Sequence, residues 1–154
     1  MQFNQLSWGV KTSFRNYVEA AGGSVKLDDG ATLAEDGSFV FAALPGGDLV
    51  IEPDGSATGA MRFQGSITFE AHGGMLKSTL NELGLEASSE GLNLTVLEGP
   101  MNQGRCAIAT LGPVDTSHKD VVTLGAKITL DGMYQIADNY PPGTELDALR
   151  LKLV

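Results

Sequence analysis

The sequence predicts a mainly β domain, an antiparallel β-sandwich with one N-terminal helix and, as an open alternative, a second short helix. Apolar residues make up 42% of the chain and charged residues 19%, which is typical of a globular domain and too apolar for disorder. The 20 glycines follow no Gly-X-Y period and lie between short apolar runs, as many turns between strands require. At 154 residues we expect one domain spanning residues 1–154.

The N-terminal helix is predicted between Ser7, which suits an N-cap, and the pair Gly22-Gly23, which favours a helix stop. Apolar side chains recur between these points at the spacing of a single helical face. They are Val10, Phe14, Tyr17, Val18 and Ala21. We therefore expect this face to pack against the rest of the domain.

After the helix the apolar period changes to two, which indicates strands. The clearest strand covers residues 58–71, where Met61, Phe63, Ile67 and Phe69 alternate with polar side chains and Gly65 marks a bulge or bend. Residues 75–87 fit either a strand or a helix. Further strands are predicted at residues 37–43, 92–97, 105–111, 121–130 and 149–154. Turns are predicted at Asp29-Gly30, Asp36-Gly37, Gly46-Gly47, Asp54-Gly55 and Asp131-Gly132.

Charge and hydropathy exclude several classes of partner. The formal net charge is −9 and no Lys/Arg cluster offsets it, so nucleic acid is not an expected partner. No run of about 18 apolar residues is present, so no membrane span is predicted. The N-terminus has no signal-peptide pattern; we expect a cytoplasmic chain as it stands, or a cell-envelope or secreted one if a signal has been removed. Cys106, the single cysteine, lies in an apolar run and is expected to be a small buried side chain.

Enzyme motifs do not account for the sequence. It contains no Gly-x-Gly-x-x-Gly, no phosphate-binding loop and no Gly-x-Ser-x-Gly elbow. The two histidines are too few and too far apart for a recognisable zinc site. Asp115, Ser117 and His118 are triad residue types, but their crowding in one loop favours a solvated turn. Catalysis is therefore not the expected function.

Three residues remain as candidates, each with an ordinary structural interpretation beside the functional one. Tyr17 fits a core tyrosine of the helix with a satisfied hydroxyl. His72 follows the clearest strand in phase with Glu70, so it points to the polar side unless the bend at Gly73-Gly74 redirects it. Tyr140 fits an aromatic residue that pins a stiff proline-rich loop to the core.

Four segments together resemble the HtaA domain, a haem-binding module of actinobacterial haem-uptake proteins. The first is Ser7-Trp8-Gly9-Val10-Lys11-Thr12-Ser13-Phe14-Arg15-Asn16-Tyr17-Val18, followed by Gly22-Gly23-Ser24. Next come Met61-Arg62-Phe63 through His72-Gly73-Gly74-Met75-Leu76, and finally Tyr140-Pro141-Pro142-Gly143-Thr144-Glu145-Leu146-Asp147. The resemblance covers nearly the whole chain and is most specific in its first segment.

The resemblance implies a β-sandwich that holds ferric haem b through a tyrosine phenolate. Tyr17 would be the axial ligand of the iron, and His72 would hydrogen-bond the phenolic oxygen. Tyr140, Phe14 and Trp8 would complete the cofactor-binding residues. A hard phenolate favours ferric over ferrous iron, which suits capture and transfer of oxidised haem.

This chain departs from the family pattern in ways that concern the ligand. Lys77 follows Leu76 where the family usually has an acidic residue, and Ala71 stands where a glycine is common. The haem propionates need local cations, and the sequence offers Lys11, Arg15 and Arg105 as candidates. Such cations are required because an acidic chain otherwise repels a dianionic ligand.

From these observations we expect a protein that binds ferric haem for uptake, transfer or storage. Its partners would be haem and a further haem-carrier or transporter protein. Two alternatives stay open. One is a cytoplasmic enzyme that uses the same sandwich cavity, and the other is a haem-free module that binds a small molecule or a protein partner.

Overall fold

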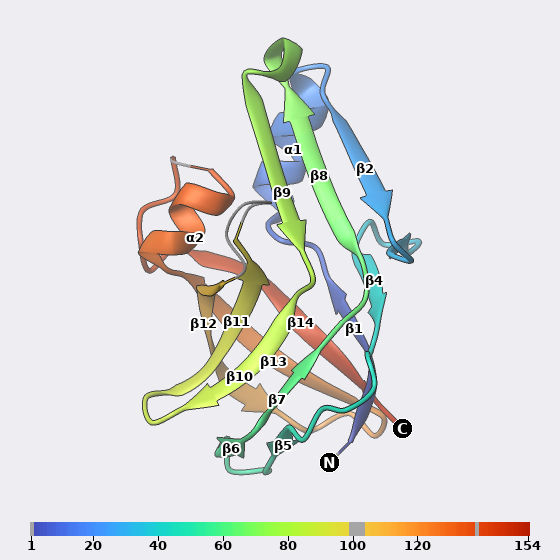
Figure 1. The fold of residues 1–154 in the computed structure, drawn as a ribbon, viewed down its shortest axis with the longest axis vertical. Helices are drawn as coiled ribbons and strands as arrows, with labels where there is room; N and C mark the ends of the chain where they lie inside the picture. The colour runs from blue at the N-terminus through green and yellow to red at the C-terminus, as the bar shows by residue number, and fades with distance from the viewer. Residues whose placement is uncertain (1, 99–103, 138) are drawn as a thin grey trace.

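A curled antiparallel sheet of nine strands forms the body of the molecule in the computed structural model, which describes residues 2–98, 104–137 and 139–154 (Figure 1). The strands of this sheet are β1 (Phe3–Trp8), β3 (Thr32–Leu33), β4 (Phe39–Ala42), β7 (Ala60–Arg62), β10 (Gly84–Ser88), β11 (Gly91–Leu97), β12 (Arg105–Asp115), β13 (Val121–Ile128) and β14 (Glu145–Leu153). They lie in the order β3-β4-β1-β14-β13-β12-β11-β10-β7, as an open half-barrel. The predicted antiparallel, mainly β fold with one N-terminal helix and a short second helix is confirmed.

A second sheet projects from one end of the half-barrel. It consists of β2 (Ser24–Asp28), β8 (Ser66–Ala71) and β9 (Leu76–Asn81), with β8 in the centre. Strands β8 and β9 form a long hairpin whose tip is the short 3-10 turn His72–Gly74. Helix α1 (Thr12–Ala20) packs behind this hairpin, and helix α2 (Leu130–Gln135) lies beside it (Figure 1). A small ribbon, β5 (Val50–Ile51) with β6 (Ala57–Thr58), lies at the opposite end.

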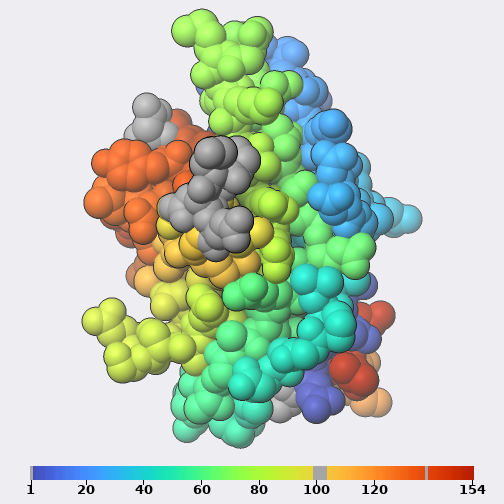
Figure 2. Space-filling view, viewed as in Figure 1, coloured from blue at the N-terminus to red at the C-terminus, as the bar shows by residue number. Residues whose placement is uncertain are grey.

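The hydrophobic core fills the half-barrel and continues under the hairpin. Its largest fully buried side chains include Trp8, Phe14, Phe63 and Phe69. Phe69 of β8 meets Phe14 of α1 edge to face, with ring centroids 4.9 Å apart. The three-stranded sheet is thus anchored through its inner face, whereas the hairpin tip and α2 stand out as separate projections (Figure 2).

The N-terminal segment folds differently from the prediction. A strand, β1, opens the domain, and Ser7 lies within that strand instead of capping a helix. Buried Leu6 and Trp8 alternate with Gln5 and Ser7, which is the period of a strand. The strand forms here instead of the predicted helix start because β1 pairs with both β4 and β14. The helix begins only at Thr12 and ends at the predicted glycine pair.

The long strand predicted at residues 58–71 is divided at Gly65. Gly65 adopts φ +123°, and a Cβ there would collide with Ala31. The chain leaves the nine-stranded sheet after β7 and enters the three-stranded sheet at β8. The bend expected at this glycine is therefore the point at which the hairpin departs from the half-barrel.

Two further local predictions are settled by the structure. The ambiguous residues 75–87 form strands, β9 and most of β10. The Asp131-Gly132 turn is wrong, because both residues lie inside α2, whose first turn is capped by Thr129. Within the described residues, no helix combines the length and hydropathy needed to cross a bilayer.

Candidate functional site

Tyr17 and His72 lie together although 55 positions separate them in the sequence. Tyr17 Oη and His72 Nε2 are 2.6 Å apart, within hydrogen-bond distance, and the ring centroids are separated by 5.7 Å. Tyr17 is 45% exposed, whereas Phe14 and Val18 on the same helix are almost fully buried. Tyr17 thus stands at the edge of the apolar face, with its hydroxyl outside the core.

The hairpin turn redirects His72 toward the helix. By strand alternation His72 would follow Glu70 to the polar side of the sheet, but it adopts φ +55°, in the left-handed region. Gly73 and Gly74 continue with φ +66° and +94°. These three positive φ values reverse the chain at the tip and bring the imidazole to Tyr17, so the bend determines the pairing.

Tyr17 and His72 form part of the wall of an open cleft of about 780 Å³. On the hairpin side the cleft is lined by Tyr17, His72, Met75, Leu76 and Lys77. On the side of α2 and the segment after it, the lining residues are Met133, Tyr134, Ile136, Ala137 and Asn139. The volume falls within the range of about 300–1,000 Å³ typical of small-molecule sites. The cleft combines apolar walls with a phenol and an imidazole as its paired polar groups.

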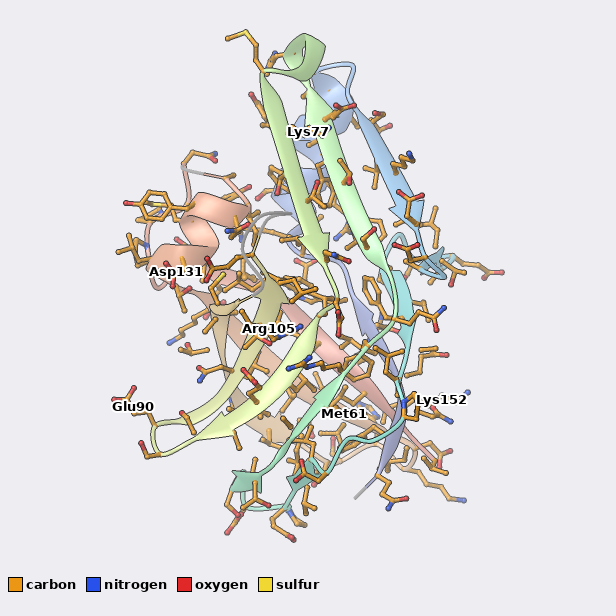
Figure 3. The ribbon with its side chains drawn as sticks, viewed as in Figure 1. Met61, Lys77, Glu90, Arg105, Asp131 and Lys152 are labelled. Carbon is orange, nitrogen blue, oxygen red and sulfur yellow. The ribbon has the colours of Figure 1, made fainter. Side chains whose placement is uncertain are left out.

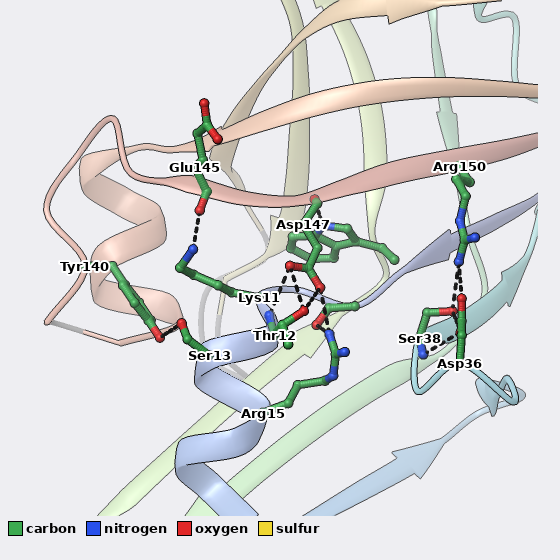
Figure 4. A network of polar contacts seen from close by, with 12 residues as sticks. Lys11, Thr12, Ser13, Arg15, Asp36, Ser38, Tyr140, Glu145, Asp147 and Arg150 are labelled. Carbon is green, nitrogen blue, oxygen red and sulfur yellow. Dashed lines mark hydrogen bonds and ion pairs between the residues drawn. The ribbon is translucent and has the colours of Figure 1, made fainter. Parts of the chain in front are cut away.

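Tyr140 lies next to the cleft but not in its lining. Its hydroxyl is 2.8 Å from Ser13 Oγ, and its ring packs edge-on against Phe14 at a centroid distance of 6.3 Å. Lys11 Nζ lies 5.7 Å from the ring centroid (Figure 4). These contacts fix the loop after α2 against the first turn of α1, and Asn139 on the same loop reaches the cleft.

Trp8 and Phe14, the other expected site residues, belong to the core. Phe14 is 1% exposed and packs against Phe69 below the helix. Trp8 is fully buried, and its indole N–H donates to the Asp147 carbonyl at 2.7 Å. Neither side chain lines the cleft, because the alternation of β1 and the helical period of α1 both turn them inward.

A polar network around Asp147 holds the beginning of α1 (Figure 4). The Asp147 carboxylate accepts from the Thr12 backbone N–H at 3.0 Å and from the Thr12 hydroxyl. Arg15 donates to the same carboxylate at 2.7 Å and to the Gly9 carbonyl at 2.6 Å. Lys11, the formal N-cap residue, makes no side-chain cap, so a carboxylate from β14 performs that role. Tyr17 is therefore carried by a helix whose start is tied to the last strand.

The cations named as partners for propionates lie elsewhere and are engaged. Lys11 donates to the Glu145 carbonyl, and Arg15 is paired with Asp147. Arg105 lies on the half-barrel, far below the hairpin tip (Figure 3), where it donates to Thr95 and to the Glu82 carbonyl. None of the three is a lining residue of the cleft. Among the described residues that line the cleft, Lys77 on the hairpin is the one with a permanently cationic side chain.

Sequence reasoning missed the wall formed by α2. Met133 and Tyr134 follow Leu130 at i+3 and i+4, which is helical spacing, and Thr129 precedes them as a cap. The helical signal is therefore present, but the predicted strand over residues 121–130 and the predicted turn at Asp131-Gly132 overlap the start of α2 and leave Met133 and Tyr134 without an element. Tyr134 is 72% exposed and Met75, across the cleft, is 91% exposed. Two large side chains thus stand on opposite lips of the cleft.

The chemistry available at the cleft centres on the hydrogen-bonded pair of Tyr17 and His72 beside apolar side chains. The described residues contain no cluster of three or more His, Cys, Asp or Glu side chains that could hold a bare metal ion. A phenol beside an imidazole can supply one anionic oxygen ligand whose charge a hydrogen bond stabilises. Apolar walls suit a large, flat hydrophobic ligand that presents its own metal centre.

The fold and the cleft define a class: a curled β-domain that frames an apolar cleft between a projecting hairpin and a short helix. The chain belongs to the HtaA family, whose model matches residues 4–152. No curated protein sequence matched the chain significantly.

Solved structures from Corynebacterium glutamicum share the fold. The C-terminal domain of HtaA is 26% identical, with a TM-score of 0.70, over 97% of this chain and 95% of that one. The N-terminal domain of HtaA is 24% identical, with a TM-score of 0.73, over 99% and 98%. The heme-binding protein HtaB is 17% identical, with a TM-score of 0.73, over 97% and 91%. Each covers nearly the whole chain, so the similarity extends to the cleft-bearing elements.

Proposed function

We propose that this protein binds ferric haem b in the cleft between the hairpin and α2, with the Tyr17 phenolate as axial ligand of the iron. The observation that carries the proposal is the 2.6 Å contact between Tyr17 Oη and His72 Nε2 at the wall of an apolar cleft. Membership of the HtaA family and the similarity to a protein described as heme-binding support it.

The residues of the cleft fit this ligand. Leu76, Met133 and Ile136 offer apolar contacts to a porphyrin face, and aromatic Tyr134 stands on the lip. When bound, haem supplies a ferric centre that prefers a hard, anionic oxygen ligand. Tyr17 provides that oxygen, and the partly exposed position of its side chain leaves it accessible from the cleft.

In this proposal His72 acts through Tyr17 rather than on the iron. An unperturbed tyrosine ionises near pH 10, so a phenolate at neutral pH needs stabilisation. A ring N–H of His72 donated to the phenolate oxygen supplies a charge-assisted hydrogen bond. The left-handed turn at the hairpin tip holds the imidazole in place before the ligand arrives.

An open cleft suits uptake and transfer better than permanent storage. Both lips carry exposed side chains, and the ligating oxygen lies near the surface, so haem can enter and leave without unfolding the core. We therefore assign the protein a role in haem uptake or transfer, with another haem carrier or a transporter as its partner and a place on the haem route into the cell.

Titration with hemin, followed by absorption spectroscopy, tests the proposal. We expect a stoichiometric shift of the Soret band with the charge-transfer features of tyrosinate-ligated high-spin iron. His72→Ala should retain haem but bind it roughly ten- to a hundredfold more weakly, the worth of one charge-assisted hydrogen bond.

His118→Ala is the matched control, because His118 is exposed in the loop between β12 and β13 and does not line the cleft. It should behave as wild type. No spectral change at micromolar hemin would reject the haem proposal and favour a haem-free binding module or an enzyme using the same cleft. Equal affinities of His72→Ala and wild type would remove His72 from the site.

A further inference from the structure

The cleft is electrostatically unlike the rest of the chain. Acidic residues outnumber basic ones by 19 to 10, yet no Asp or Glu is found among the described residues that line the cleft. Lys77 is the permanently charged residue in that lining, and its side chain stands beside Glu70 at the outer face of the hairpin. An anionic ligand would therefore meet a positive charge at the margin of the cleft, within an otherwise repulsive field.

The Lys77 ammonium is held loosely. Its partner is Glu70, directly opposite on β8, at an N···O distance of 3.9 Å. Lys77 is 63% exposed and Glu70 45%, and an exposed pair at this separation contributes little to stability. Exchange of the Glu70 carboxylate for a carboxylate of the ligand therefore costs little.

The position of Lys77 suits the polar edge of a bound ligand rather than its centre. Lys77 belongs to β9, an edge strand of the three-stranded sheet, five residues beyond His72 (Figure 3). Its flexible four-carbon stem lets the ammonium reach past the strand edge while staying hydrated. Carboxylates at the solvent-facing margin of an apolar ligand can be met there.

We infer that Lys77 recognises the propionate carboxylates of the ligand and thereby determines ligand specificity. In the absence of ligand, the Lys77 ammonium is paired with the Glu70 carboxylate. This inference rests on the proposed haem function. Lys77 contributes by charge, so its effect requires carboxylates on the ligand and weakens with salt.

A comparison of two ligands isolates that contribution. Ferric haem and its dimethyl ester share the iron and the macrocycle, but the ester has no carboxylates. Lys77→Gln should bind haem about three- to tenfold more weakly than wild type at low salt and bind the ester within twofold of wild type. Lys77→Arg should restore most of the haem affinity, and Glu70→Gln should raise it by about twofold.

Lys26→Gln is the matched control. Lys26 is an exposed lysine on the same small sheet, paired with Asp28 at 3.8 Å and 74% exposed, but it does not line the cleft. Both substitutions remove one positive charge, so they change the overall field equally. Lys26→Gln should therefore leave the haem affinity within twofold of wild type.

The possible outcomes distinguish failure of the role assigned to Lys77 from failure of the proposed haem binding. Equal losses in Lys77→Gln and Lys26→Gln, or an equal loss toward haem and its ester, would overturn the role of Lys77 while leaving haem binding intact. Failure of the wild type to bind either ligand would overturn the proposed function and this inference together.

Discussion

Asp147 should control both the stability of the domain and the placement of Tyr17. Asp147→Ala removes the acceptor of the Thr12 N–H and the partner of Arg15 in a single change. Loss of a helix cap costs about 0.5–2 kcal/mol. Loss of the charge-assisted bond to Arg15 adds about 1 kcal/mol, because both side chains are partly exposed, at 21% and 28%. We therefore expect a free energy of unfolding lower by roughly 1.5–3 kcal/mol.

Urea unfolding measures this loss directly, and thermal unfolding should show a Tm lower by roughly 3–12 °C for a domain of this size. Asp147→Asn, which keeps an oxygen acceptor but removes the charge, should lose about half as much. Haem affinity should fall in step with the alanine variant, because α1 then frays toward Tyr17. A midpoint equal to that of wild type in Asp147→Ala would refute the assignment of Asp147 as the cap of α1.

Three further predictions follow from packing and burial. Gly132→Ala should lower stability and haem affinity together, because a Cβ there collides with the Ile108 carbonyl and pushes α2 from β12; unchanged urea midpoint and Soret titration would contradict this close approach. Tyr140→Phe should weaken haem binding only modestly and keep the tyrosinate spectrum, since the Tyr140 hydroxyl is hydrogen-bonded to Ser13 Oγ. Burial, with Glu98 and Asp131 nearby, raises the pKa of the Cys106 thiol, so iodoacetamide should alkylate it more slowly at pH 8 than the same thiol in urea, and equal rates would show an accessible thiolate.

Local patterns predicted most of the fold because they describe one element at a time. The short apolar runs in 92–97 and 105–111 predicted β11 and the first part of β12, and the glycine pair after Ala21 predicted the end of α1. Gly65 was recognised as a bend, although its effect, the change of sheet between β7 and β8, depends on a collision with Ala31 that no local pattern contains.

The site was predictable in its chemistry but not in its geometry. Tyr17 and His72 were paired only through resemblance to a family, since the strand phase alone aims His72 the other way. The cap from Asp147, 135 positions after Thr12, has no local signature. Trp8 was expected at the ligand because it belongs to the same motif as Tyr17, but its indole N–H satisfies the Asp147 carbonyl in the core. Membership of the motif therefore identified residues that act together, but it did not distinguish residues that line the cleft from residues that hold them in place.

The most direct test of the account is the binding of ferric haem by Tyr17→Phe, which removes one oxygen atom and preserves the packing of the ring. Hemin titration followed in the Soret and charge-transfer regions should show the tyrosinate spectrum in wild type. In the variant that spectrum should be absent and the affinity lower by at least a hundredfold, with an unchanged urea midpoint as proof of folding. Retention of the wild-type spectrum and affinity by Tyr17→Phe would contradict the claim that Tyr17 is the ligand.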